Sequence, residues 1–170
     1  MRDSRMRDSR KRYGVAMTTE WKLPWNGGCR CDQVRIQITQ PPIMTMACHC
    51  AGCQRMTASA FSLSIMVPSA GFAVTTGEPV IGGLHGGSKH YHCGHCKSWM
   101  FTRPEGLDGF VNIRATMLDD HLWVRPYVEV CRDEAFPWAT TGAAHGFPNI
   151  PPNGTWGPLM SQFLKDGPRP

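Results

Sequence analysis

The stretch "ACHCAGCQR", residues 47–55, places three thiols, at Cys48, Cys50 and Cys53, almost side by side. A disulfide framework, a packed core and a metal site each predict a different arrangement of the other cysteines in the sequence. The other cysteines lie in "CRC" (Cys29 and Cys31), in "CGHC" (Cys93 and Cys96) and alone at Cys131. Seven of the eight cysteines are therefore in close-spaced groups, a pattern that favours metal ligation.

The two outer pairs have the spacing of a closed zinc site. Residues i and i+2 of a strand share a face, so we expect Cys29 and Cys31 to present their thiols together from a strand. The "CGHC" turn folds Cys93 and Cys96 toward each other, and Gly94 permits its tight backbone. Four thiolates form a tetrahedral structural zinc site, which here would cross-link two segments far apart in the sequence.

The remaining group, Cys48, Cys50 and Cys53, offers three ligands. Three protein ligands and one exchangeable position are typical of a catalytic zinc, whereas four-ligand sites are structural. Three thiolates make a soft, electron-rich site that suits a sulfur ligand. The predicted role is therefore to bind and deprotonate an incoming thiol.

Other interpretations stay open for these residues. Each pair is compatible with a disulfide or a redox dithiol, although no βαβ pattern surrounds "CGHC", and an iron–sulfur cluster accepts the same thiolates. The histidines among the cysteines, His49, His92 and His95, are either ligands and ligand partners or ordinary loop residues. Cys131 is expected to be a small buried hydrophobe.

Period-two alternation dominates the rest of the chain and predicts a mainly β fold of antiparallel sheets. Longer strands are expected in 33–39, 61–67 and 122–130, and shorter ones in 71–74, 89–93, 98–101 and 110–115. Only 51–58 is predicted to be helical. From residue 134 onward the chain has many Pro and Gly residues, and we expect 138–170 to wrap the sheets without regular structure.

Length and charge indicate one domain with tails. The 170 residues suffice for a single core, assigned to 17–137, and 1–16 is predicted to be a disordered basic leader. Residues 1–12 hold +4 of the formal charge of +5, without interleaved aromatics, so nucleic-acid binding is disfavoured. No apolar run reaches the ~18 residues of a membrane span. We therefore expect a cytoplasmic protein with reduced thiols.

The order of "GGCRC", "CHCAGCQR", "CGHC" and "LDD" resembles the glutathione-dependent formaldehyde-activating (GFA) family, which also includes centromere protein V. The resemblance runs from about Trp25 to Pro137. It implies a β-tent fold with two zinc ions per chain. It assigns a structural zinc to Cys29, Cys31, Cys93 and Cys96, and a catalytic zinc to Cys48, Cys50 and Cys53. Lys97 stands where the family commonly has glycine.

The resemblance also implies an activity, the condensation of glutathione with formaldehyde to S-hydroxymethylglutathione. The first hypothesis is therefore a zinc-dependent carbon–sulfur lyase whose partner is a small thiol such as glutathione. The alternative is a non-catalytic, zinc-stabilised binding module for protein or nucleic acid. An apolar edge strand would also allow a homodimer.

Overall fold

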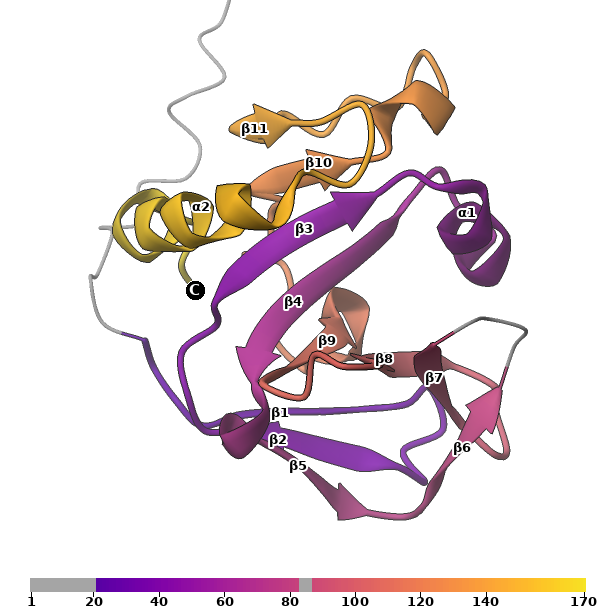
Figure 1. The fold of residues 1–170 in the computed structure, drawn as a ribbon. Helices are drawn as coiled ribbons and strands as arrows, with labels where there is room; N and C mark the ends of the chain where they lie inside the picture. The colour runs from indigo at the N-terminus through magenta and orange to yellow at the C-terminus, as the bar shows by residue number, and fades with distance from the viewer. Residues whose placement is uncertain (1–20, 83–86) are drawn as a thin grey trace, which may run out of the picture.

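The structure is a computed structural model that describes residues 21–82 and 87–170. The predicted leader, 1–16, lies outside these residues. The described part is mainly β, with two sheets and two α-helices (Figure 1). The predicted fold class is confirmed.

The smaller sheet is antiparallel and has the strand order β1-β2-β5. Its strands are β1 (Trp25–Gly28), β2 (Arg35–Ile38) and β5 (Phe72–Thr76). Val34, Ile36 and Ile38 are all buried on one side. The alternation in 33–39 predicted this face correctly, because every second side chain of a strand points the same way.

The larger sheet has eight strands in the order β11-β10-β3-β4-β9-β8-β7-β6. Their bounds are β3 (Met44–Cys48), β4 (Ser62–Pro68), β6 (Pro79–Gly82), β7 (Ser88–Cys93), β8 (Trp99–Pro104), β9 (Phe110–Arg114), β10 (Val128–Val130) and β11 (His145–Gly146). Strand β10 pairs in parallel with both β3 and β11, so this sheet is mixed. The expected strand over 122–130 is confined to its last three residues, because Pro126 fixes its φ and lacks an amide donor.

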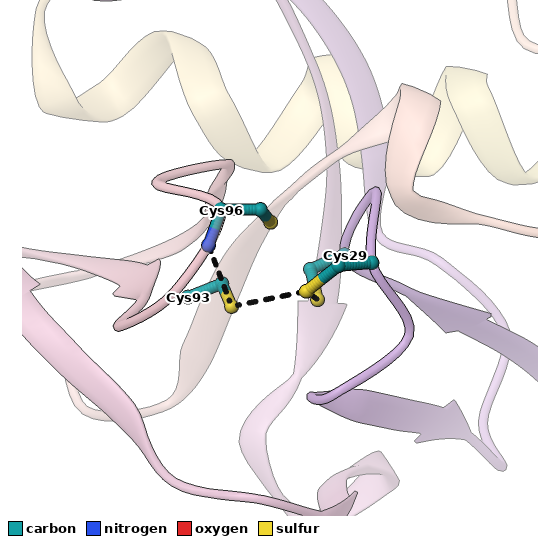
Figure 2. Close-up of side chains that lie close together, drawn as sticks. Cys29, Cys93 and Cys96 are labelled. Carbon is teal, nitrogen blue, oxygen red and sulfur yellow. Dashed lines mark hydrogen bonds between the residues drawn. The ribbon is translucent and has the colours of Figure 1, made fainter.

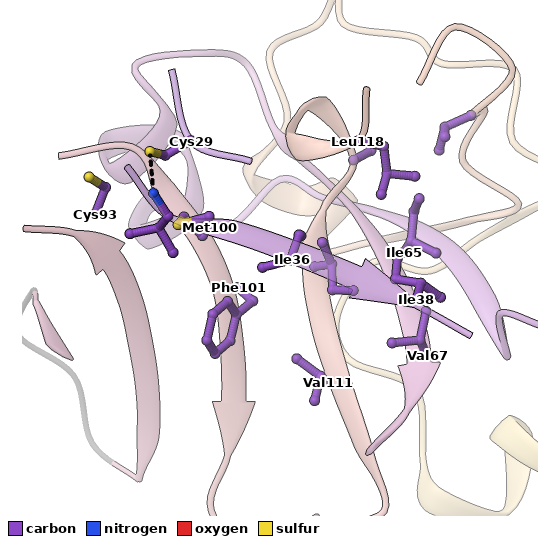
Figure 3. Packing of buried hydrophobic residues seen from close by; sticks show 14 residues of the cluster. Cys29, Ile36, Ile38, Ile65, Val67, Cys93, Met100, Phe101, Val111 and Leu118 are labelled. Atoms are coloured by element: carbon purple, nitrogen blue, oxygen red, sulfur yellow. Dashed lines mark hydrogen bonds between the residues drawn. The ribbon is translucent and has the colours of Figure 1, made fainter. Parts of the chain in front are cut away.

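Two apolar cores lie on opposite faces of β4. Ile65 and Val67 pack into the core between the two sheets, whose side chains Figure 3 shows in a layer that ends at Cys29 and Cys93. Met66, on the other face, belongs to a second core beneath the C-terminal helix. Strand β4 is therefore covered on both sides, which places its N-terminal end firmly beside the cysteine cluster of residues 48–53.

The C-terminal segment is more regular than predicted. Residues Asn153–Asp166 form helix α2, which lies along β3 (Figure 1) despite Pro158 within it. Its inward side chains are Trp156, Leu159, Met160 and Phe163. Burial of such side chains contributes about 1.5–3 kcal/mol each, and together this exceeds the roughly 3 kcal/mol that a proline inside a helix costs. The expectation of an irregular wrap was therefore wrong for this part, and its i, i+3, i+4 spacing was the missed signal.

Short elements connect the strands. The predicted helix in 51–58 is present as α1 (Ala51–Thr57), and three 3₁₀ turns occupy Ser69–Gly71 (η2), Ala115–Met117 (η3) and Arg132–Glu134 (η4). Edge strand β6 exposes Val80 and Ile81, and the homodimer stays a prediction. In the described residues, no helix is both long enough and apolar enough to cross a membrane.

Candidate metal centres

The thiols of the four-cysteine cluster come from two facing turns. Cys29 and Cys31 lie just after β1, in the turn to β2. Cys93 is the last residue of β7 and Cys96 lies in the turn to β8, and both face Cys29 (Figure 2). The expectation that Cys29 and Cys31 share a strand face was wrong. The β1 ladder ends at Gly28, and the amide of Asp32 closes a turn on the carbonyl of Cys29 at 3.0 Å.

In each turn, one backbone amide donates a hydrogen bond to a cysteine sulfur. The amide of Val34 donates to Cys29 Sγ at 3.4 Å, and that of Cys96 donates to Cys93 Sγ at 3.5 Å. Each turn also contains a non-glycine residue in the left-handed region, Asp32 with φ 57° and Lys97 with φ 60°. Asp tolerates this conformation, whereas for Lys it is strained by about 1–2 kcal/mol.

The sulfur geometry of the four-cysteine cluster fits a tetrahedral metal. Cys29 Sγ lies 3.5 Å from Cys31 Sγ, which lies 3.8 Å from Cys93 Sγ. Four sulfurs about 2.3 Å from a zinc ion are separated by about 3.8 Å. Cys29 and Cys93 are buried. A hydrogen bond with the Ser98 hydroxyl, 3.3 Å away, lowers the pKa of Cys96 to about 5, which favours the thiolate.

The thiols of the three-cysteine cluster come from a strand end and a helix start. Cys48 is the last residue of β3, Cys50 is the N-cap of α1, and Cys53 lies in its first turn. The amide of Cys53 donates to Cys50 Sγ at 3.4 Å, so the same sulfur that caps the helix faces the cluster. The three sulfurs lie within 4.8 Å of one another and could hold a metal ion. All three residues are partly exposed, unlike the buried pair of the other cluster.

Side chains from distant segments hold α1 in place. Gln54 donates to the carbonyls of His49, at 2.6 Å, and Glu134, at 2.9 Å, and the Glu134 carboxylate accepts from the amide of Ala51 at 2.8 Å. The segment 48–53 is therefore fixed to the turn η4. These contacts preorganise the three thiols before any metal binds.

The histidines and carboxylates singled out in the sequence have other partners. His49 is buried, with Nε2 3.4 Å from a carboxylate oxygen of Glu129, and His95 is exposed. Neither they nor His92 belong to a described metal-binding group. Asp119, which follows η3, forms an ion pair with Arg35 at the start of β2, at 2.5 Å. Cys131 is buried beside Cys48 but outside the three-cysteine cluster.

A buried cation lies beside the three-cysteine cluster. Hydrogen bonding with Cys48 is the largest cause that lowers the pKa of Cys53, to about 6, and the charge of Arg114 lowers it further. Burial lowers the pKa of Arg114 to about 10, while the charges on Cys53 and Cys48 oppose this shift. Arg114 thus stays protonated at neutral pH. It can offset the negative charge that three thiolates concentrate at this site.

A cavity of about 490 Å³ lies between the two clusters. One wall comes from the end of α1 and the start of β4, and another from the turn that follows Cys96. Its lining residues are Met56, Thr57, Ser59, Phe61, Leu63, Lys97, Ser98, Trp99, Arg114, Thr116 and Met117. Thr57, which donates to the carbonyl of Cys53 at 2.8 Å, and Arg114 connect the cavity to the three-cysteine cluster.

Sequence reasoning found the seven clustered cysteines but missed the cavity. Arg114 was predicted only as part of a strand over 110–115, and Trp99 only as part of a strand over 98–101; neither was predicted to be a site residue. The sequence pattern carried no signal for Arg114, since it shares a face of β9 with the polar Asn112, opposite Val111 and Ile113, and so follows the alternation although it is buried. Nothing in the sequence pattern indicated that the two residues stack, with the guanidinium carbon 4.1 Å from the Trp99 ring centroid.

Comparison with known proteins agrees with the cysteine pattern. The family model for the glutathione-dependent formaldehyde-activating enzyme matches residues 24–134, more than half of the chain. The chain belongs to this family. The match contains both clusters and ends at Glu134, whose carboxylate accepts the Ala51 amide at the start of α1.

Other comparisons are more distant. No curated protein matches the chain. Among solved structures, a Rhodobacter sphaeroides protein from a structural genomics programme is similar, at 16% identity and a TM-score of 0.47. The match covers 55% of this chain and 87% of that protein.

Proposed function

We propose that this protein is a zinc-dependent carbon–sulfur lyase that joins a small thiol, such as glutathione, to formaldehyde. The observation that carries this proposal is a group of three partly exposed thiols with metal-binding geometry, beside a cavity. Membership of the GFA family supports the same reaction class. The free thiols of all eight cysteines suit a reducing compartment such as the cytoplasm.

Two zinc ions with different roles suit the two clusters. We assign the structural ion to Cys29, Cys31, Cys93 and Cys96, whose sulfurs satisfy a tetrahedral ion without help. We assign the catalytic ion to Cys48, Cys50 and Cys53, which leave one tetrahedral position for substrate. A zinc ion bound by these three residues would hold an incoming thiol as its thiolate.

The residues around the three-cysteine cluster perform the other tasks of the reaction. Gln54 and Glu134 fix the segment that bears the thiols. Arg114 offsets part of the negative charge that three protein thiolates and a fourth from the substrate would bring. The cavity holds the body of the thiol, with Phe61 and Trp99 on its apolar side. In the overall reaction a carbon–sulfur bond forms, the carbonyl π bond breaks, and the thiol proton ends on oxygen, so no oxidant or reductant is needed.

The test is the formation of S-hydroxymethylglutathione from glutathione and ¹³C-formaldehyde, followed by exchange NMR. Zinc-loaded protein should accelerate exchange between free and adduct carbon over the uncatalysed rate. Cys50→Ser should abolish this acceleration, and Cys131→Ser, a change beside the cluster, should retain it. Equal exchange with and without the loaded wild-type protein would contradict the proposal. That result would favour the alternative, a non-catalytic binding module. Binding of the full chain to immobilised nucleic acid would test this alternative.

A further inference from the structure

The cavity between the clusters is lined by two basic residues and no acidic one. Of its described lining, Lys97 and Arg114 are charged, while the other polar members are hydroxyl side chains. Within the described part of the chain, no carboxylate forms an ion pair with either cation. A concave surface with this charge favours an anionic ligand, because walls of low dielectric strengthen the field inside.

Lys97 occupies a backbone position that suits glycine. Its φ of 60° is in the left-handed region, where a long side chain is disfavoured. The ammonium group donates to the carbonyl of Gly94 at 2.5 Å, which anchors it near the turn. This acceptor is neutral, and the described carboxylates form no ion pair with Lys97. Lys97 is exposed and belongs to the lining, so it brings a positive charge to the solvent-facing side of the cavity.

Arg114 provides the second cation deeper in the same cavity. The residue is only 7% exposed, and its guanidinium lies over Trp99. Nη2 donates to the carbonyl of Asn112 at 3.4 Å, whereas the buried Nε has no hydrogen-bond partner. The positive charge of Arg114 interacts with the negative charges of Cys53 and Cys48. Lys97 has no such contact among the described residues, which makes it the better anchor for an incoming anion.

We propose that Lys97, with Arg114 behind it, forms a carboxylate subsite that selects thiols bearing a negative charge. This inference rests on the proposed function, since it concerns how the substrate of the three-cysteine cluster is chosen. A thiol whose sulfur reaches that cluster would place its body along Phe61 and Trp99 and a carboxylate at Lys97. Glutathione, with two carboxylates, is a suitable probe, and its diethyl ester has the same skeleton without them.

The test compares the binding of these two thiols to the zinc-loaded full chain by calorimetry. Lys97→Met keeps a long side chain at the strained position and removes its charge. It should weaken glutathione binding about 5-fold to 10-fold, the effect of one charge-assisted contact, and leave binding of the diester unchanged. Lys97→Arg should restore binding of glutathione. The matched control is Lys89→Met, an exposed lysine on β7 outside the cavity lining, which should change neither affinity.

Two results would overturn the subsite. If Lys97→Met weakens both thiols equally, the residue acts through the turn and not through charge. If it weakens neither, the carboxylate binds elsewhere. The proposed function fails separately, when wild-type protein forms no adduct in the exchange experiment. Preference for glutathione over its diester, lost in Lys97→Met, would support the subsite even in that case.

Discussion

The four-cysteine and three-cysteine clusters contain the same donor atom but differ in how the chain supplies it. Four thiols come from two turns at the end of the inter-sheet core, and Cys29 and Cys93 are buried there. Three thiols come from one continuous segment, 48–53, and remain partly exposed beside a cavity. Besides the sulfurs, the described contact between the two turns of the first cluster is a long hydrogen bond, from the Arg30 amide to the Ser98 hydroxyl at 3.4 Å. The segment of the second cluster is held by shorter hydrogen bonds, of 2.6–2.9 Å, from Gln54 and to Glu134. Metal binding should therefore support folding at one cluster and chemistry at the other.

The largest effect is expected from Cys93→Ala. The change removes a ligand from the four-cysteine cluster and leaves the turns after β1 and β7 without their cross-link. Structural zinc contributes roughly 10 kcal/mol or more of coupled folding free energy in small sites, so the domain should unfold. Circular dichroism and thermal melting test this. A melting temperature equal to that of the wild type would contradict the structural role.

The next effect separates the clusters by metal stoichiometry. Cys50→Ala should lower the zinc content, measured by elemental analysis, from two ions per chain to one and abolish glutathione binding. The fold should survive, because loss of the Cys50 cap on α1 costs about 1 kcal/mol. Cys131→Ala is the matched control and should keep both ions, since Cys131 lies outside the cluster. If Cys131→Ala also loses one zinc ion, Cys131 is a fourth ligand and the three-cysteine cluster is part of a closed, four-ligand site.

A smaller effect concerns the charge beside the three-cysteine cluster. Arg114→Gln should weaken zinc at this cluster by roughly 10-fold to 100-fold, the usual range for a residue that supports metal ligands. Competition with a chromophoric chelator would measure it. Arg103→Gln, which also removes a guanidinium stacked on a ring but on the core side at Phe72, should leave the affinity unchanged. Equal loss in both variants would indicate a general effect on the sheet.

The sequence predicted what depends on local spacing. The alternation of Val34, Ile36 and Ile38 identified a buried face, and close-spaced cysteines identified two groups that the structure brings together. Both signals act over a few residues. The conformation of Cys29 to Cys31 was predicted wrongly, because the strand ends at Gly28 through its pairing with β2.

What could not be predicted depends on contacts between distant segments. Helix α2 has the i, i+3, i+4 spacing of a helix, but spacing alone does not decide whether Pro158 ends it; the burial of Leu159 and Phe163 against β3 and β10 does. The cavity exists because residues near 57, 97 and 114 meet in the folded sheet. Local spacing does not reveal their role, since residue 57 ends α1, residue 114 ends β9, and residue 97 lies in the turn after β7.

The smallest expected effect compares the two turns of the four-cysteine cluster. Lys97→Gly relieves a strain of about 1–2 kcal/mol but adds backbone entropy to the unfolded chain, about 0.5–1 kcal/mol. It should therefore stabilise the zinc-loaded protein by about 0.5–1 kcal/mol in urea unfolding.

Asp32→Gly is the matched change in the other turn and should not stabilise. Asp tolerates the left-handed region, and its carboxylate accepts a hydrogen bond from Arg35 at 2.8 Å that glycine would lose. A gain in both variants would mean that strain is common to both turns and says nothing particular about residue 97. A gain at 97 alone would show that this chain retains a destabilising lysine. The binding of glutathione and its diester to Lys97→Met would then decide whether the charge of Lys97 at the cavity accounts for this.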